Sequence, residues 1–332
     1  MRKLNKLKKI VLVNLMILGF VALCSCSLNT IKYEDADKYK AGDAEFTCSF
    51  DSVEIDWSAG SVDIKYHDSD TVKIEEISNK EVDENMTVHY YTDGKTLHVK
   101  YQKSGKVNTY LNLQKNLTLT LPQTVSLEKL DIDTASADVK VEKTDAADID
   151  INTASGNISG SFYNVKYFDL DAASGDATVE IDGAELVSLD TSSGDMNIQC
   201  SGYLKEINAD AASGEITVSA AGVGKFSVDT SSGNVTLNSA EAVENVSVGT
   251  ASGNVILSSD KKIENISVET ASGDVTLRIP EDNGFTLDYD TASGDFMCEL
   301  PTSKKDGRYT CGDGVCKYIV DTASGDLSVF EK

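Results

Sequence analysis

The feature that most constrains this chain is a six-residue motif that recurs ten times at a nearly fixed spacing. Each copy follows the pattern of ETASGD: usually an acid or amide, Thr or Ala, a small residue, Ser, usually Gly, and an acid or amide. Successive copies are 19–21 residues apart, except for a last step of 31 residues. A fixed period in this range is typical of stacked repeats. The copies begin at Asp133, Asn152, Asp171, Asp190, Asp210, Asp229, Gly249, Glu269, Asp290 and Asp321.

Apolar residues alternate on both sides of each motif. If the leading residue is position 0, positions −3, −1 and +6 are apolar in every copy, and position +8 in all but one, where Gly160 stands. Alternation with period two predicts strand, tight corner, strand. No segment after residue 25 keeps the period of 3.6 that a helix needs. We therefore predict an all-β fold, a β-solenoid or parallel β-helix with coils of roughly 19–20 residues.

Four regions follow from this pattern. Residues 1–25 read as a lipoprotein signal peptide and residues 26–44, which are polar and aperiodic, as a tether. Residues 45–128 contain a degenerate coil around DWSAGS (56–61), then less regular strands, including a hairpin signal at Asp93-Gly94. We expect them to form a mixed-strand cap, because an open stack must cover its end. Residues 129–332 hold the solenoid repeats.

The first 26 residues predict a lipid anchor. A basic start, MRKLNKLKK, precedes a fourteen-residue apolar run at 10–23, which is short for a spanning helix of about 20 residues. The run ends in Leu23-Cys24-Ser25-Cys26, which resembles a bacterial lipobox with Cys26 as the modified residue. A cleaved signal with incidental cysteines is the alternative. A lipidated Cys26 would hold the protein outside the cytoplasm, on the outer face of the cell membrane.

The repeated corner itself predicts a structural role. Gly at +4 permits a bend or a backbone conformation that side chains forbid, and stacked Ser at +3 would satisfy backbone groups of the turn. Asp or Asn at 0 and +5 can make Asx-type turn bonds. The predicted turn ladder comprises Ser155, Gly156, Ser174, Gly175, Ser193, Gly194, Ser213, Gly214, Ser232, Gly233, Ser252, Gly253, Ser272, Gly273, Ser293 and Gly294.

Two other readings of polar residues stay open. Stacked carboxylates at Asp171, Asp190, Asp210 and Asp229 repel one another unless they are screened or bridged, so a calcium ladder is the alternative to turn capping. Cys311 and Cys316 flank Gly-Asp-Gly-Val in the long final insertion, where an exported protein could form a local disulfide. We expect no other metal and no cofactor.

Charge and residue content exclude several function classes. The net charge of −24 repels phosphate backbones, so we expect no nucleic-acid partner. A serine hydrolase needs one activated serine near a histidine, whereas here the serine recurs in every copy and all three histidines precede the repeats. After the signal peptide only Arg278 and Arg308 supply guanidinium groups, which disfavours a polysaccharide lyase. We predict that the chain is not an enzyme.

Three stretches carry a resemblance to a known family: LTLTLPQTVSLEKLDIDTASADVKVE (117–142), the TASGD and TSSGD coils, and VTLRIPEDNGFTLDYDTASGDF (275–296) with CGDGVCKYIVDTASGDLSVF (311–330). Together they resemble a bacterial family of envelope-associated β-strand-repeat domains of unknown function, commonly labelled "putative adhesin". The resemblance covers roughly residues 45–332. It implies a β-solenoid at the cell surface and brings no catalytic residues.

These observations predict a lipid-anchored, extracytoplasmic module that binds or supports without catalysis. Its partners would be the membrane, through the anchor, and a cell-wall polymer, a surface glycan or an envelope protein. One alternative is an envelope-stress sensor that acts by contact with a membrane partner. A weaker alternative is a carbohydrate-active β-helix enzyme.

Overall fold

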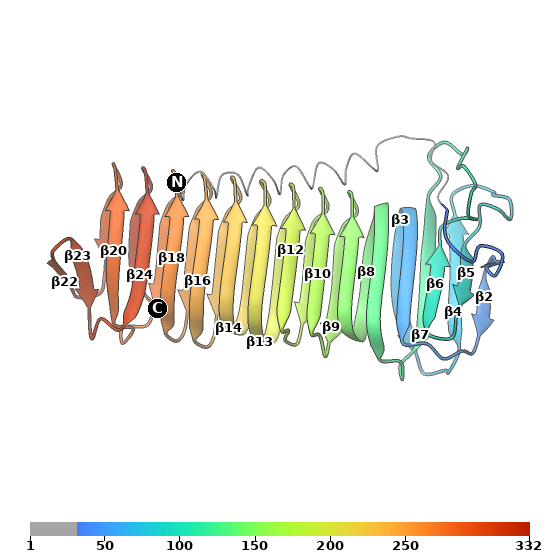
Figure 1. The fold of residues 1–332 in the computed structure, drawn as a ribbon, viewed down its shortest axis with the longest axis horizontal. Helices are drawn as coiled ribbons and strands as arrows, with labels where there is room; N and C mark the ends of the chain where they lie inside the picture. The colour runs from blue at the N-terminus through green and yellow to red at the C-terminus, as the bar shows by residue number, and fades with distance from the viewer. Residues whose placement is uncertain (1–31) are drawn as a thin grey trace. The chain divides into compact units, whose positions relative to one another are not determined.

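The computed structural model describes residues 32–332, and this part of the chain is built from strands, turns and loops (Figure 1). It divides into two compact units. Unit 1 comprises residues 32–162 and 171–176, and unit 2 comprises residues 163–170 and 177–332. The predicted signal peptide and Cys26 lie outside the described residues. From residue 32 onward, no helix is long and apolar enough to span a membrane.

Unit 1 begins with short strands and ends with long ones. Its strands are β1 (Lys40–Ala41), β2 (Ala44–Phe46), β3 (Ser52–His67), β4 (Val72–Ser78), β5 (His89–Thr92), β6 (Thr96–Lys100), β7 (Lys115–Pro122), β8 (Leu127–Thr153) and β9 (Ile158–Tyr163), the last of which ends at the unit boundary. The predicted hairpin at Asp93-Gly94 is confirmed as the antiparallel pair β5–β6.

The degenerate first coil, β3, does not lie at the end of unit 1. One edge of β3 pairs in parallel with β8, so that Ile55 faces Ile132 and Val62 faces Val139. Its other edge pairs in parallel with β6 and then with β7. The segment 96–122 therefore forms a further coil outside β3, although it follows β3 in the chain.

Part of the predicted tether is folded onto the cap. Strand β1 pairs with β5, and the Tyr33 hydroxyl donates a hydrogen bond to the Gln102 carbonyl at 3.0 Å. The Tyr33 and Tyr39 rings lie 4.5 Å apart, and Tyr39 packs against Tyr91. The tether prediction is therefore wrong for residues 32–44, because aromatic packing and strand pairing hold them. Residues 26–31 lie outside the described part.

Unit 2 contains the regular repeats. Its strands are β10 (Tyr167–Ala172, which crosses the unit boundary), β11 (Ala177–Ile181), β12 (Leu186–Thr191), β13 (Met196–Ala211), β14 (Ile216–Thr230), β15 (Val235–Ser239), β16 (Val243–Thr250), β17 (Val255–Ser259), β18 (Ile263–Thr270), β19 (Val275–Ile279), β20 (Phe285–Thr291), β21 (Phe296–Cys298), β22 (Thr302–Lys305), β23 (Arg308–Cys311), β24 (Cys316–Thr322) and β25 (Leu327–Glu331).

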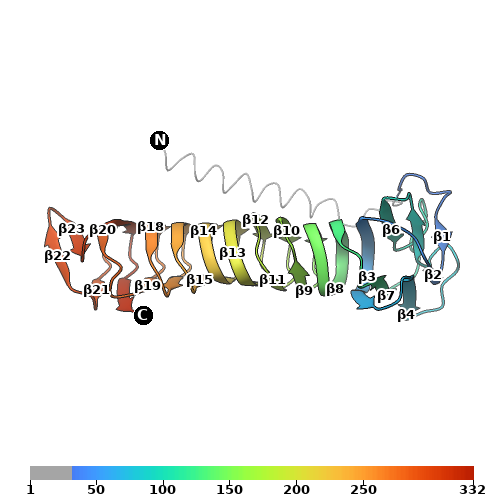
Figure 2. The ribbon, with the colours of Figure 1, turned by 90° about the horizontal axis from the view of Figure 1, so that it is seen from below.

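Equivalent positions of successive repeats in unit 2 lie side by side. Val228 pairs with Val248, and Val248 with Val268, each in parallel register. The predicted parallel stacking is thus confirmed within this unit. Its strands form two layers, with β18 and β20 on one side and β19 and β21 on the other (Figure 2). Unit 2 is all-β and solenoid-like.

The last repeat of the sequence does not occupy the end of unit 2. Strand β24 pairs in parallel with β18 on one edge and with β20 on the other (Figure 1). Strand β25 likewise pairs with β19 and with β21. The coil of β20 and β21 is therefore outermost, although it precedes β24 in the chain. The hairpin β22–β23 then continues the layer of β20.

The predicted inward positions form the core between the layers. Along β16, Val246 and Val248 are buried, and Val255 and Leu257 follow them on β17. Each such aliphatic side chain stabilises the fold by about 1.5–3 kcal/mol through burial. The intervening residues point outward, so every coil contributes a row of polar side chains to the surface.

Candidate binding surface

We define the corner as positions 0 to +5 of each motif, and its threonine is a structural residue. In the copies with Thr at +1, the Gly amide at +4 donates to the threonine hydroxyl, for example Gly253 to Thr250 and Gly273 to Thr270, both at 2.9 Å. These threonines are buried, so their hydroxyls pair an amide that would otherwise be unsatisfied inside the protein. Sequence reasoning missed this role, although the recurring Thr was its signal.

The serines at +3 link neighbouring coils, as predicted for the turn ladder. Within unit 2, the Ser213 hydroxyl donates to the Ser192 carbonyl at 3.2 Å, and the Ser272 hydroxyl to the Ala251 carbonyl at 3.4 Å. Each hydroxyl bonds the backbone of the adjacent coil. These serines therefore hold the stacked corners together.

The glycines at +4 are required because coils approach closely, and here the sequence interpretation was wrong. We expected either a bend or a backbone conformation that side chains forbid. The chain does bend at the corner, but the corner glycines have no positive φ. Instead, a Cβ on Gly273 would lie 1.9 Å from the Gly253 carbonyl oxygen, and one on Gly253 would lie 1.8 Å from that of Gly233. No side chain fits at such a distance.

The residues at +5 also bond between coils rather than within their own turn. The Asp274 amide donates to Asn254 Oδ1 at 2.9 Å, and the Asp326 amide donates to Asp274 Oδ1 at 2.9 Å. A carboxylate and an amide side chain offer the same acceptor, so Asp and Asn alternate freely here. The column caps backbone groups, as predicted, but through the neighbouring coil.

The column at position 0 gives no support to a calcium ladder. Asp190, Asp210 and Asp229 lie side by side on β12, β13 and β14, while Asp171 belongs to unit 1. In the next coil position 0 is Gly249, and the Asp229 carboxylate occupies the space of the missing side chain. A Cβ on Gly249 would lie 2.3 Å from Oδ1 of Asp229. Within residues 32–332, no group of three or more His, Cys, Asp or Glu side chains is arranged to hold a metal ion.

Cys311 and Cys316 are free, and the fold keeps them apart. Phe285 on β20 pairs with Cys311 on β23 on one side and with Cys316 on β24 on the other. Two strand spacings separate the cysteines by roughly 9–10 Å, and a disulfide needs Cα atoms within about 7 Å. The predicted local disulfide is therefore corrected, because the insertion does not bring the two strands together.

The cap contains a buried lysine that no sequence pattern indicated. Lys115 is fully buried, and its ammonium group contacts Glu76 at 2.6 Å and the carbonyls of Met86 and Tyr101. It also lies over the rings of Trp57 and Tyr101. Burial lowers the pKa of Lys115 to about 8, although Glu76 opposes the shift. Burial likewise raises the pKa of the Glu76 carboxyl, so both partners are biased toward neutrality.

A second polar cluster lies on the outer side of β3 and β6. Glu54 bonds His98 at 3.0 Å and also contacts Lys100, which in turn contacts Asp56. Burial opposes ionisation of Glu54, but its contacts with Lys100 and His98 outweigh burial and lower its pKa. Next to them, burial and neighbouring carboxylates raise the pKa of Asp133 to about 6. These side chains satisfy one another across the strands.

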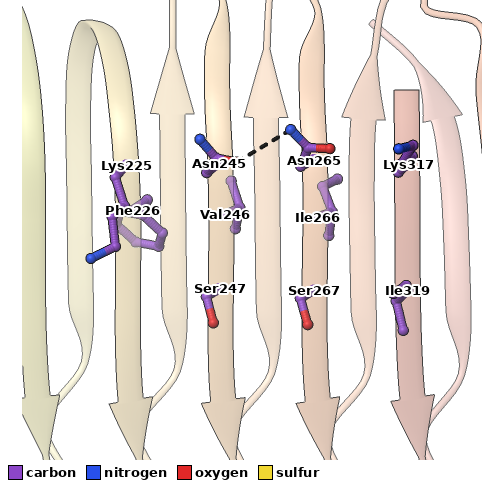
Figure 3. A pocket seen from close by; sticks show the side chains of 10 residues that line it. All are labelled: Lys225, Phe226, Asn245, Val246, Ser247, Asn265, Ile266, Ser267, Lys317 and Ile319. Atoms are coloured by element: carbon purple, nitrogen blue, oxygen red, sulfur yellow. Dashed lines mark hydrogen bonds between the residues drawn. The ribbon is translucent and has the colours of Figure 1, made fainter. Parts of the chain in front are cut away.

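The outer face of unit 2 carries a shallow groove, which we define by two rows of outward side chains. The first row is Lys225, Asn245, Asn265 and Lys317, and the second is Ser247, Ser267 and Ile319. The rows cross β14, β16, β18 and β24 in register (Figure 3). The groove encloses about 330 Å³, which is within the usual range for ligand sites of roughly 300–1,000 Å³.

The groove offers polar groups at regular intervals. Asn265 Nδ2 donates to Asn245 Oδ1 at 3.2 Å, and this hydrogen bond orients the two side-chain amides relative to each other. Within the described chain, the Asn245 NH2 and the hydroxyls of Ser247 and Ser267 have no protein partner. The side chain of Ile319 is 46% exposed and gives the groove an apolar contact. Neighbouring strands repeat these groups about every 4.8 Å.

The groove could not be found from the motif alone. Positions −4 and −2, which line it, vary among copies, and their outward alternation was the only available signal. The insertion of β24 beside β18 also brings Lys317 and Ile319 next to Asn265 and Ser267, although about 50 residues separate them in the chain.

The comparisons with known proteins bear on the family. Among curated proteins, none matches the sequence. Solved structures are similar to this chain, and three examples have TM-scores below 0.5. They are a "putative cell adhesion protein" of Clostridium sporogenes (12% identity, 88% of this chain and 100% of that one, TM-score 0.21), and two proteins of Parabacteroides distasonis. Of these, one is a "putative adhesin" (16%, 76% and 100%, 0.41) and the other a "putative lipid binding protein" (16%, 90% and 99%, 0.40).

The family profile is decisive. The profile of the Toastrack DUF4097 family matches residues 50–255 and 225–330, which together span the cap coil, β3 and the repeats. This range agrees with the resemblance carried by residues 45–332 of the sequence, and it covers most of the described chain. The chain belongs to the Toastrack DUF4097 family of β-strand-repeat domains of unknown function.

Proposed function

We propose that this chain is a lipid-anchored, extracytoplasmic β-solenoid that binds an extended neutral polysaccharide without catalysis. The signal sequence and the lipobox at Cys26 support the location and the anchor. The observation that carries the binding role is the groove on unit 2, whose amides and hydroxyls repeat in register on β16 and β18, with Lys225 of β14 on one side and Lys317 and Ile319 of β24 on the other. A repeating polymer matches a repeating array, because each unit can make the same contacts.

The chemistry of the groove favours sugar hydroxyls. The Asn245 and Asn265 amides both donate and accept, and so do the serine hydroxyls beside them. Ile319 can pack against the apolar face of a sugar ring. Lys225 and Lys317 are the charged residues that line the groove, and Lys225 is paired with Glu206 at 2.6 Å. The net charge of −24 and the acids Asp229 and Glu269 at position 0 disfavour a polyanion. Neutral glycans of the cell wall or of another cell surface are therefore the proposed ligands.

The absence of catalysis is proposed from the side chains that are present. The repeated serines donate to backbone carbonyls, and the histidines lie in the cap, in unit 1. The groove itself has no carboxylate among its lining residues. General acid–base hydrolysis of a glycan would need such a pair of acids.

The test is retention of the protein on insoluble neutral polysaccharides, compared with anionic ones. We expect the intact chain to be retained by a neutral polymer, and Asn265→Ala and Ser267→Phe to weaken retention at least tenfold. Asn238→Ala is the matched control, because Asn238 is exposed on β15 in the opposite layer. Equal retention of Asn265→Ala and the intact chain would refute the groove as the site. Release of soluble oligosaccharides would refute the absence of catalysis.

A further inference from the structure

The outermost coil of unit 2 is built like the interior coils but is covered on one side only. Strand β21 pairs with β25, and in the described chain no strand pairs with its other edge. Phe296 and Cys298 are partly exposed, whereas Leu327 and Val329, their equivalents on β25, are buried. The interior of the last coil is therefore open to solvent at this end.

The open edge also has free backbone groups. Asp295 accepts a hydrogen bond from the Leu327 amide, and the Glu299 amide donates to Val329, so alternate residues of β21 face β25. By the alternation of a parallel ladder, the N–H and C=O groups of Phe296 and Cys298 point away from it. Such an edge accepts another strand.

The two layers end unevenly at this point. Beyond β20, the hairpin β22–β23 adds two strands to one layer, while the other layer ends at β21. The hairpin also contacts β21, since the Tyr309 ring on β23 lies 4.3 Å from the Phe296 ring. The overhang is about 10 Å wide, which is the width of two strands.

We propose that two copies of this chain associate tail to tail, each placing its β22 along the open β21 of the other. The two copies are related by a two-fold axis that is parallel to the strands and lies midway between the layers. The overhanging β22–β23 hairpin of one copy then lies beside the shorter layer of the other, which ends at β21. Because the two layers of unit 2 run in opposite directions (Figure 3) and β22 runs parallel to β20, β22 of one copy meets β21 of its partner antiparallel. The same patch serves both copies, so the contact closes as a dimer.

Charge selects this partner over an unrelated strand. Strand β22 carries the exposed Lys304 and Lys305 in a chain with a net charge of −24. Its proposed neighbour β21 is flanked by Asp295 and Glu299, both exposed. The dimer therefore sets the lysines of each copy against the acids of the other.

Sedimentation velocity of the full chain in detergent tests the inference. We expect a dimer for the intact chain and a monomer for the double variant Lys304→Glu/Lys305→Glu, with at least a tenfold loss of association. Cys298→Pro, which removes an outward amide and leaves the pairing with β25, should have the same effect. The control is Lys261→Glu/Lys262→Glu, the same charge change at an exposed pair elsewhere on unit 2, which should remain dimeric.

Circular dichroism melting of each variant separates loss of association from loss of fold. The inference is overturned if the intact chain is monomeric. In that case the lysines of β22 would prevent, rather than promote, pairing of this edge with another chain. It is equally overturned by open-ended oligomers, or by a dimer that survives both changes at the open end.

Discussion

The buried pair of Lys115 and Glu76 predicts an unusual dependence of stability on pH. The Lys115 ammonium group is enclosed by Trp57, Tyr101 and backbone carbonyls, and it has a single carboxylate partner. Its pKa falls from the ordinary 10.5 to about 8 because burial disfavours the charge. The unfolded chain therefore holds the lysine proton over a range in which the folded chain has lost it.

The sign and size follow from this difference. Where the unfolded state binds more protons, the free energy of unfolding rises with pH. For one group whose folded pKa is depressed by 2–3 units, the rise from about pH 8 to about pH 10 is about 2 kcal/mol. Burial raises the pKa of Tyr101, so above about pH 10 ionisation of the unfolded tyrosine reverses the trend. The raised pKa of Glu76 acts at acidic pH. Burial raises the pKa of the Cys48 thiol in unit 1, and its ionisation in the unfolded chain from about pH 8.5 lowers stability in the same window. The contribution of Lys115 is therefore the difference between the intact chain and a variant that lacks the pair.

Urea unfolding followed by tryptophan fluorescence measures the effect. Trp57 is the only tryptophan, and its indole N–H donates to the Lys115 carbonyl at 2.7 Å, so the signal reports on unit 1 around the pair. The double variant Lys115→Met/Glu76→Gln removes both charges and should show no such rise. If the intact chain gains no stability relative to the double variant between pH 8 and pH 9.5, the reasoning is refuted.

Further predictions concern the repeats and the anchor. Val275→Asp should destabilise unit 2 by several kcal/mol, since an unpaired charge replaces a side chain that is 1% exposed; an unchanged melting temperature would contradict the inward assignment. Gly273→Ala should prevent close stacking and abolish the cooperative melt, because its methyl group would meet a carbonyl oxygen. Cys311 and Cys316 should both react with a thiol reagent after unfolding without reductant, and failure to do so would mean that they are bonded. Cys26→Ser should abolish incorporation of a labelled fatty acid, and continued labelling would reassign the lipidated residue.

The regular parts of the fold could be predicted because their chemistry is periodic. Alternation of apolar residues around each corner identified positions such as Val255 and Leu257 as inward, and both are buried. The stacked serine bonds followed from the same register. A strand period of two places every second side chain inside, so one residue in register is enough to assign the whole coil.

The order of the coils could not be predicted, because the repeats are chemically interchangeable. By the pattern of inward residues alone, Val275 on β19 could pair with Phe296 on β21 or with Leu327 on β25. In the structure β19 pairs with β25. The 31-residue step before Asp321 was the one irregularity that pointed to this end. Lys115 gave no signal either, since it precedes an ordinary alternating strand, and only the folded cap shows which groups surround it.

Interchangeable coils also explain why the departures from the repeat lie where they do. A coil that can stack on any neighbour can stack on a coil of another chain, so the repeat alone does not specify where a ladder stops. In unit 1 the strand pairs beyond β3 come from 96–122, which lacks the motif, and Lys115 stands opposite Gly60, where a Cβ would lie 2.1 Å from its carbonyl oxygen. In unit 2 the equivalent position is held by the β22–β23 hairpin, which also lacks it. Stacking is therefore encoded by what the copies share, and its termination by the segments that differ, which is where a partner chain would be accepted or refused.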